Sequence, residues 1–328
     1  FQPLRHRHAP VGNRLHHAQL TAGRNRAGRA PAVRQKTQAA AGGNAGILLP
    51  QRSGRSVARV REQLVAAFFL RRSFRGDALY AAVFAAYVRR LLRDGFNIEF
   101  FVEGGRSRTG KLLPPKLGLL GMVADAVLDG EVATTQAVPI AITYEKVVEA
   151  GSYARELAGG EKRKEDLGAL LGARRVLRSR NGRIDLRIGE PFGIAEALAS
   201  AGAPIGAPEA VRKAAVRRLG HRVMYAIGQT TPVTPSALVA ASCLATVTRA
   251  IRRSDLDRRA SWLAARARAR GARFATALAE DFGGAITRAL GLLASSGDVE
   301  VRGDEGDGLI VVPDERRIRL EYYKNNLI

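Results

Sequence analysis

This chain of 328 residues has little sulfur and few aromatic side chains: one cysteine, two methionines, and 6% Phe, Trp and Tyr. A single cysteine, Cys243, excludes an internal disulfide framework and fits a reducing compartment. No apolar run approaches the roughly 18 residues that a membrane-spanning helix needs, and the longest, residues 78–88, is rich in alanine. We therefore expect an intracellular globular protein of about two domains, with no signal peptide and no membrane crossing.

Acidic residues are absent from positions 1–61, which hold 12 of the 53 Lys and Arg. The segment also lacks any helical or alternating apolar period. We expect residues 1–62 to be a basic segment without a folded core: a truncated start, a disordered arm or a stretch read in the wrong frame, the last two being favoured. The remaining 267 residues keep +11 of the net charge of +23, which suits an anionic substrate or an anionic membrane surface.

Past residue 63, apolar residues alternate between strand and helix periods, which predicts an α/β core over residues 63–204. Strand, helix, strand, helix, strand is the order of a mixed or parallel sheet flanked by helices. The expected elements are strands at 64–70, 97–102, 137–143 and 183–188, with helices between Asp77 and Gly95, at 117–128 and at 161–178. The first helix is expected to bury one apolar face, made of Leu79, Val83, Phe84, Tyr87, Leu91 and Leu92.

Residues 205–328 differ in composition and are dominated by Ala, Arg and Leu. This composition predicts a helical C-terminal region. A short hairpin, residues 299–302 with 309–312, and a last helix from Glu315 complete it. The expected helices lie at about 207–228, 235–251, 255–270 and 272–294.

Residues 101–116 are the most informative stretch, because an apolar strand pattern ends there in one carboxylate, glycines and four cations. Gly104 and Gly105 let a ligand approach the backbone, and several cationic side chains can converge on negative charge. Arg106, Arg108 and Lys111 could give a phosphate both charge and hydrogen bonds. The stretch predicts a seat for a small phosphorylated molecule, and its alternative is a solvated basic loop with glycines serving only the turn.

Residues 105–111 also satisfy G-x-x-x-x-G-K, the pattern of a nucleotide-binding loop. Leu112 stands where a Ser or Thr should hold Mg²⁺, and Pro114-Pro115 interrupts the helix that should follow. Nucleotide binding is therefore disfavoured.

Residues 101–116 resemble the third signature block of the bacterial membrane-associated glycerol-3-phosphate acyltransferases, centred on 103–108. Residues 68–74 resemble the second block of that family. Val138-Pro139-Ile140 with Tyr144-Glu145 resembles the fourth, and similarity continues over about 65–328.

The resemblance implies the α/β glycerolipid acyltransferase fold and transfer of a fatty acyl group from acyl-CoA or acyl carrier protein to the sn-1 hydroxyl of glycerol 3-phosphate. It implies no metal or other cofactor, and a peripheral place on the cytoplasmic face of the inner membrane. The expected substrate-binding residues are Arg71, Arg72, Glu103, Gly104, Gly105, Arg106, Ser107, Arg108 and Lys111.

A catalytic base is missing from the sequence. The family supplies a histidine with an aspartate five positions later, expected upstream of residue 65, to take the proton of the attacking hydroxyl. Five positions after the histidines 6, 8, 16, 17 and 221 stand Val11, Asn13, Thr21, Ala22 and Ala226. No catalytic residue is identifiable, so the chain is either mis-framed before the second block or a catalytically silent relative.

Other classes fit less well. The four N-terminal histidines have no metal-ligand spacing and no neighbouring Cys, Asp or Glu. Nucleic-acid binding would place Asp304, Glu305 and Asp307 of the predicted hairpin against phosphates, so no nucleic acid is expected. A membrane-binding adaptor without chemistry, using arginine-rich helices such as 255–270, stays open.

Overall fold

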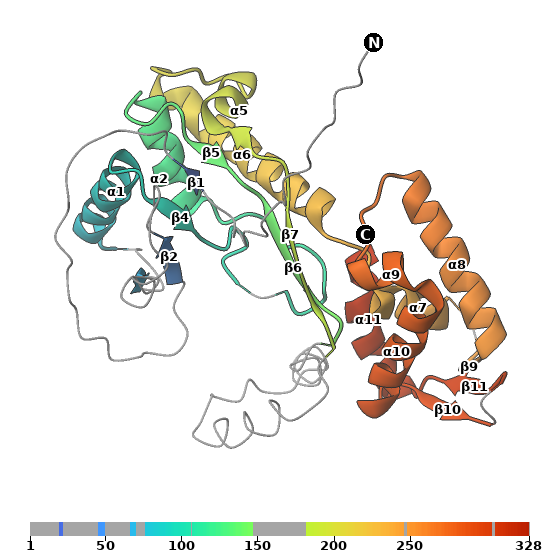
Figure 1. The fold of residues 1–328 in the computed structure, drawn as a ribbon. Coiled ribbons are helices and arrows are strands. Elements are labelled where there is room, and N and C mark those ends of the chain that lie inside the picture. The colour runs from blue at the N-terminus through green and yellow to red at the C-terminus, as the bar shows by residue number, and fades with distance from the viewer. Residues whose placement is uncertain are drawn as a thin grey trace, which may run out of the picture.

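The computed structural model describes the chain in separate stretches, and every structural statement below refers to them. They are residues 20–21, 45–49, 66–69, 76–105, 107–146, 182–245, 248–303 and 306–327. Two packed regions are visible in Figure 1: one around α1, α2, α5 and α6, the other formed by α7–α11, with the β6–β7 hairpin running between them.

The larger sheet of the first region has six strands in the order β3-β2-β4-β1-β5-β8. Its ladders are antiparallel in every described pairing, so the direct parallel neighbours predicted from the sequence are not confirmed. The strands are β1 (Leu20–Thr21), β2 (Ala45–Leu49), β3 (Ala66–Phe69), β4 (Asn97–Glu99), β5 (Gln136–Ala137) and β8 (Phe192–Gly193).

The sheet has no directly adjacent parallel strands because two strands from the first 62 residues are inserted between the others. β2 lies between β3 and β4, and β1 lies between β4 and β5. Because each inserted strand is antiparallel to both neighbours, β3, β4 and β5 still run in one direction, as helical connections require. The rest of residues 1–62 lies outside the described stretches, and its nature stays a prediction.

Helices pack on this sheet around one apolar core. α1 (Ala78–Arg93) begins where predicted, since the Asp77 side chain accepts a hydrogen bond from the Tyr80 N–H at 2.9 Å. α2 (Leu117–Leu128), α5 (Ile194–Ser200) and α6 (Glu209–Thr230) complete the layer. The core includes residues from Phe84 to Met224, so α6 packs in it.

The predicted buried face of α1 is only partly right. Phe84, Leu91 and Leu92 are buried with Val88, as helical spacing requires. Leu79, Val83 and Tyr87, on the next stripe around the helix, are 77%, 60% and 42% exposed. The apolar arc of this helix is wider than the surface that covers it.

The strand expected at 137–143 divides into β5 and β6 (Ile140–Tyr144), with Val138 and Pro139 between them. Proline has no N–H to donate to a ladder, so it falls at a break. β6 pairs with β7 (Ile184–Ile188) as an antiparallel two-stranded ribbon, in which Ile140 faces Ile188 and Tyr144 faces Ile184. Residues 145–183 connect the two strands, and we call the pair the β6–β7 hairpin. The helix predicted at 161–178 lies outside the described residues.

The C-terminal region is helical, as predicted, around a second core that runs from Val233 to Tyr323. The predicted hairpin is confirmed as β10 (Glu300–Arg302) with β11 (Leu309–Val311), and β9 (Ala250–Arg252) adds a third antiparallel strand. The helices are α7 (Pro235–Leu244), α8 (Arg253–Ala269), α9 (Thr276–Glu280), α10 (Phe282–Ser295) and α11 (Arg317–Lys324), with 3₁₀ turns at Asp314–Arg316 and Asn325–Leu327.

Two predicted helices in this region were too long. The helix expected at 235–251 ends at Leu244, and its last residues form β9 instead. The helix expected at 272–294 is interrupted at Asp281, whose side chain accepts a hydrogen bond from the Gly284 N–H at 2.9 Å and starts α10 afresh.

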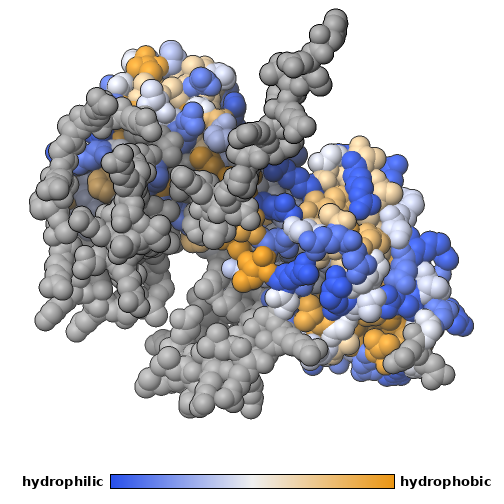
Figure 2. All heavy atoms as spheres, in the orientation of Figure 1, coloured by the Kyte–Doolittle hydropathy of each residue, from blue (hydrophilic) through white to orange (hydrophobic). Residues whose placement is uncertain are grey.

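The arginine-rich C-terminal region presents much of its charge to solvent. Figure 2 shows hydrophilic side chains over much of the visible face of the α7–α11 region, with smaller hydrophobic patches between them. Arg252, Arg258 and Arg302 are among the exposed cations. In the stretches that the structure describes, no helix has the length and apolarity needed to cross a bilayer.

Candidate functional site

The cationic stretch predicted as a phosphate seat is the connection from β4 to α2. We call residues 103–116 the Gly/Arg loop. Its two ends meet through a main-chain hydrogen bond from the Lys116 N–H to the Val102 carbonyl oxygen at 2.7 Å. A turn opens it, in which the Gly104 N–H donates to the Phe101 carbonyl and Gly104 takes φ +62°, a conformation that favours glycine.

Glu103 braces this loop from within. Its Oε2 accepts a hydrogen bond from the Leu113 N–H at 2.8 Å, ten residues further along the chain. A charged acceptor makes such a bond stronger than a neutral one would. The carboxylate thus ties the first residue of the loop to its second half.

The tip of the loop contacts the end of the C-terminal helix. The Asn325 side-chain amide donates to the Thr109 carbonyl oxygen at 2.7 Å. Gly110, with φ +79°, lies so close to Tyr322 that a Cβ built on it would stand 2.1 Å from the Tyr322 carbonyl oxygen. These two contacts join the loop to the second core.

The second half of the loop packs on α6. Pro115 and Leu117 lie against Gly220, where a Cβ would meet them at 3.2 and 2.7 Å, and Leu112 lies near Gly228. α2 begins only at Leu117, so no helix continues from Lys111 as a nucleotide-binding loop requires. The structure agrees with the sequence in disfavouring nucleotide binding here.

Matches to known families cover most of the chain. Residues 56–143 match a family described as Acyltransferase. Residues 153–328, more than half of the chain, match the family described as Glycerol-3-phosphate acyltransferase C-terminal region. The chain belongs to the glycerol-3-phosphate acyltransferase family. The recognition made from the signature blocks is confirmed.

Curated relatives agree with this family. Glycerol-3-phosphate acyltransferases of Pseudomonas savastanoi pv. phaseolicola and Pseudomonas syringae pv. tomato are each 32% identical over 273 residues, which cover 80% of this chain and 32% of the relative. The glycerol-3-phosphate acyltransferase of Shewanella loihica is 33% identical over 272 residues, covering 80% and 33%. The chain spans about a third of the length of the relatives it matches.

The Gly/Arg loop carries several of the predicted substrate-binding residues. Arg108 and Lys111 are exposed, and Ser107 is half-buried with a buried hydroxyl that has no hydrogen-bond partner among the described residues. Among the described residues other than its chain neighbours, no atom lies within 4 Å of the position of a Cβ on Gly105, so the chain is open on that side. Arg71, Arg72 and Arg106 lie outside the described residues, and the substrate contacts of the whole set stay predictions.

Glu145, in the stretch that resembles the fourth signature block, lies where the β6–β7 pair meets α7. Glu145 is buried, and its Oε2 accepts a hydrogen bond from the Arg183 N–H at 2.9 Å. Its carbonyl oxygen accepts another from the Ser236 hydroxyl at 2.6 Å. This glutamate is therefore occupied in joining the hairpin to the second core.

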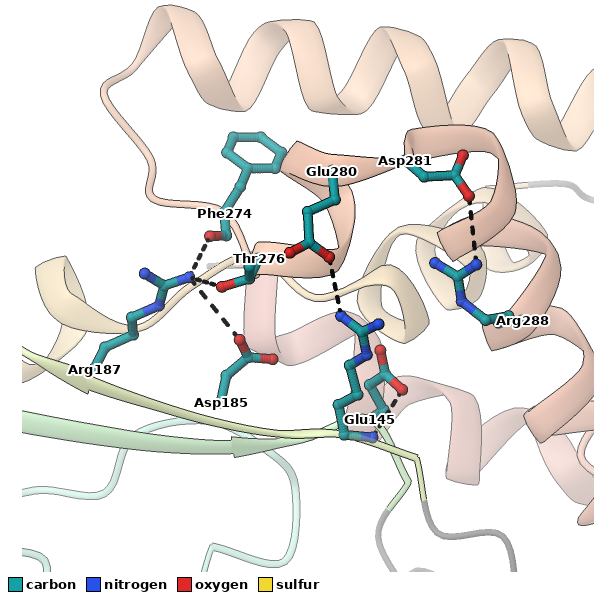
Figure 3. A network of polar contacts seen from close by, with 9 residues as sticks. Glu145, Asp185, Arg187, Phe274, Thr276, Glu280, Asp281 and Arg288 are labelled. Atoms are coloured by element: carbon teal, nitrogen blue, oxygen red, sulfur yellow. Dashed lines mark hydrogen bonds and ion pairs between the residues drawn. The ribbon is translucent and has the colours of Figure 1, made fainter. Parts of the chain in front are cut away.

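Arg187 of β7 makes a second connection, shown in Figure 3. Its Nη2 donates to the Phe274 carbonyl at 3.1 Å and to Thr276 Oγ1 at 2.9 Å, at the start of α9. Asp185 lies 3.9 Å from the same nitrogen, and an exposed pair of Arg183 with Glu280 at 3.3 Å lies nearby.

Sequence reasoning assigned no role to Arg187 or Asn325. Each acts on a segment that is 87 or more residues away, so no local spacing marks it. Asn325 lies in residues 321–326, which are part of the stretch that resembles the family. That resemblance is the feature of the sequence that could have pointed to this residue.

An ion-pair network joins α1, the end of α2 and α6 in the first region. Asp129 forms ion pairs with two arginines. Arg212 Nη1 lies 2.6 Å from its Oδ1, and Arg89 Nη1 lies 2.6 Å from its Oδ2. The hydrogen bonds from Arg212 and Arg89 lower the pKa of Asp129 below its usual range. Burial raises the pKa of neighbouring Asp125, although Arg212 and Arg89 oppose this.

A buried carboxylate in the second core is also paired. Asp298 is fully buried, with Ser296 donating to Oδ2 at 2.6 Å and Arg319 Nε 2.7 Å from Oδ1. The Arg319 contact is an ion pair, since neither of those two atoms makes an aligned hydrogen bond. Burial raises the pKa of Asp298, and Ser296 and Arg319 limit the rise.

His221 and Cys243 have no proposed part in the site. His221 is exposed on α6. Cys243 is buried in α7, and burial raises the pKa of its thiol to about 12. Within the described stretches, His, Cys, Asp and Glu side chains do not gather in threes as a metal site would require.

Proposed function

We propose that this chain carries the acceptor-binding part of a glycerol-3-phosphate acyltransferase. The acceptor would be glycerol 3-phosphate, and the donor a fatty acyl thioester of coenzyme A or acyl carrier protein. The observation that carries the proposal is the Gly/Arg loop, which is closed at its base by Lys116 and Glu103 and presents Arg108 and Lys111 to solvent within the family-matched region.

The charges of the loop suit the phosphate of the acceptor. Lys111 supplies a point charge, and Arg108 supplies a planar fork of donors matched to phosphate oxygens. The buried Ser107 hydroxyl, which has no partner among the described residues, and the main chain at Gly105 are further donors in the proposed set. Arg71, Arg72 and Arg106 complete the proposed set on the strength of the signature blocks.

The reaction joins the sn-1 oxygen of the acceptor to the acyl carbonyl carbon and breaks the carbon–sulfur bond of the thioester. The hydroxyl proton must pass to a base, and the thiolate leaves and is protonated. No metal or other cofactor enters this proposal. Arginine cannot act as the base, and the sequence holds no H-x-x-x-x-D, so we expect acceptor binding with little or no turnover.

Calorimetry with glycerol 3-phosphate, glycerol and inorganic phosphate tests the binding proposal. We expect heat of binding from glycerol 3-phosphate, weaker binding of phosphate and none of glycerol. A chain that is folded but binds none of the three contradicts the proposal. Release of free coenzyme A from an acyl-CoA in the presence of glycerol 3-phosphate measures turnover, and robust release would mean that another base exists.

We further propose a peripheral place on an anionic membrane, at the cytoplasmic face of the inner membrane. The supporting observations are the net charge of +23 and the exposed apolar stripe Leu79, Val83 and Tyr87 on α1. Cosedimentation with vesicles containing anionic lipid tests this. Leu79→Ser with Val83→Ser should reduce the bound fraction, whereas Val211→Ser on α6 serves as an exposed apolar control.

A further inference from the structure

The contact between Asn325 and the tip of the Gly/Arg loop joins residues 216 positions apart in the chain. Asn325 is only 8% exposed, so water competes little for its amide. The acceptor is the main-chain carbonyl of Thr109, so no side chain of the loop takes part in this bond. The bond therefore fixes where the backbone of Thr109 lies without using a side chain of the loop.

Gly110 fits against the same helix end. Its φ of +79° is a conformation that residues with a Cβ rarely adopt. A Cβ there would also meet the Tyr322 carbonyl oxygen at 2.1 Å and its carbonyl carbon at 3.0 Å. Both the conformation and the close approach require glycine, so the backbones of the loop and of α11 touch.

The helix end that receives the loop is firmly held. Leu320 and Tyr323 of α11 are buried in the second core, and the Tyr322 and Tyr323 rings lie edge to face at 5.9 Å. The Asn325 N–H donates to the Glu321 carbonyl, so the residue caps α11 with its own main chain. The side chain that reaches Thr109 thus starts from a fixed position.

Thr109 and Gly110 stand between Arg108 and Lys111, the two described cations of the proposed acceptor site. The base of the loop is held by Glu103 and Lys116, and its later part by packing on α6. Contact with α11 then holds the two main-chain residues that lie between these cations.

We propose that Asn325 is a positioning residue for the anion-binding loop: by holding Thr109 it orients Arg108 and Lys111 toward the phosphate of the acceptor. The inference rests on the proposed function for the identity of the anion. It makes the C-terminal helix, which bears no proposed substrate contact, part of what determines acceptor affinity.

Hydrogen–deuterium exchange tests the anchoring without any ligand. In Asn325→Ala we expect amides of residues 109–113 to exchange roughly three- to tenfold faster, as loss of one hydrogen bond implies. Peptides from α2 and α10 should be unchanged. Asn326→Ala is the matched control, because Asn326 is the same residue type one position on and makes no hydrogen bond to the described part of the loop.

A second variant covers the case in which Asn325→Ala does not fold. Asn325→Asp keeps the size of the side chain and its backbone cap but sets an oxygen against the Thr109 carbonyl. The same faster exchange at 109–113 is expected. Unchanged exchange in a folded variant overturns the inference.

Calorimetry then separates this inference from the proposed function. With glycerol 3-phosphate we expect roughly three- to tenfold weaker binding for Asn325→Ala than for wild type or Asn326→Ala, at a similar melting temperature. Faster exchange with unchanged affinity would overturn the positioning role. Faster exchange in a protein whose wild type binds no glycerol 3-phosphate would instead refute the proposed function and leave the anchoring of the loop in place.

Discussion

Ser236 Oγ donates a 2.6 Å hydrogen bond to the main-chain carbonyl oxygen of Glu145, across 91 residues of chain. Both residues are buried. Ser236 lies in the first turn of α7, and Glu145 directly follows β6. The helix that begins the second core is thereby bonded to the hairpin that leaves the first.

Removal of this hydroxyl should destabilise the protein. Ser236→Ala leaves the Glu145 carbonyl without that donor in a site closed to water, and we expect a loss of about 1–2 kcal/mol in the free energy of unfolding. Urea unfolding followed by circular dichroism measures it. Ser200→Ala is the control, since the Ser200 hydroxyl bonds within its own helix at an exposed position. Equal losses in the two variants would contradict this account.

Arg187 should show a specific coupling to Thr276. A double-mutant cycle of Arg187→Ala and Thr276→Val should give a coupling free energy of about 0.5–1.5 kcal/mol, because the 2.9 Å bond between them carries a charged donor. The measurement is the urea midpoint of the four proteins. Strict additivity would mean that the contact contributes nothing to stability.

The neighbouring pair of Arg183 with Glu280 provides the contrast. Its side chains are 53% and 60% exposed, and exposed ion pairs contribute little. The corresponding cycle of Arg183→Ala and Glu280→Ala should couple by about 0.5 kcal/mol or less. A larger coupling here than at Arg187 would reverse the expected order of the two connections (Figure 3).

Local chemistry made some of this structure predictable from the sequence. Asp77 as a helix cap, the Gly/Arg loop after a strand and the last hairpin depend on neighbours within a few residues, and all three are found. The insertion of β1 and β2 between other strands depends on pairings 18 to 117 residues apart, for which the sequence carries no short-range signal.

The candidate site divides in the same way. The cations and glycines of residues 103–111 could be identified by type and spacing. That Glu103 would bond the Leu113 N–H, or that Asn325 would reach Thr109, depends on tertiary packing and could not be predicted from spacing. The exposed stripe of α1 is a related case, since apolar periodicity shows which residues share a face but not how much of it is covered.

Asp129 should make stability depend on pH. Its pKa is lowered in the folded protein by Arg212 and Arg89, so between that value and the ordinary one near 4 the unfolded chain binds more protons. The stabilisation is therefore present above about pH 4 and lost as pH falls through the folded pKa. Asp129→Asn should be less stable than wild type at pH 7, with the two curves converging as the pH falls below about 4, as measured by urea midpoints across pH.

Glu190→Gln is the matched control for this pH series. Glu190 is exposed, and the structure shows it in no ion pair with the described residues. Its curve should follow that of wild type across the whole range. An Asp129→Asn curve that runs parallel to wild type, with no convergence in acid, would remove Asp129 as a source of the pH dependence.

Cys243 should resist thiol reagents while the protein is folded. Burial in α7 raises its thiol pKa to about 12, so almost no thiolate is present or accessible at pH 8. In buffer, an aromatic disulfide reagent should react with less than about a tenth of the folded protein over minutes. In about 6 M guanidinium, which unfolds the protein, it should react with one thiol per chain. Rapid reaction in buffer would mean that α7 opens readily.

Arg106 lies outside the described residues, yet the signature block makes it the sharpest test of the acceptor proposal. A guanidinium–phosphate bond is charge-assisted, so Arg106→Ala should weaken glycerol 3-phosphate binding by about ten- to a hundredfold. Binding of an acyl-CoA should change far less, because the loop is proposed to hold the acceptor.

Arg302→Ala is the control for this prediction. Arg302 is an exposed arginine of β10 that pairs with Glu300, and its replacement should alter neither affinity. Unchanged glycerol 3-phosphate affinity in Arg106→Ala, or an equal loss in Arg302→Ala, would show that general positive charge rather than this loop attracts the acceptor. Repeating the titrations at higher salt distinguishes the two causes further, because attraction by diffuse charge is screened while a short hydrogen-bonded contact keeps most of its difference between wild type and variant.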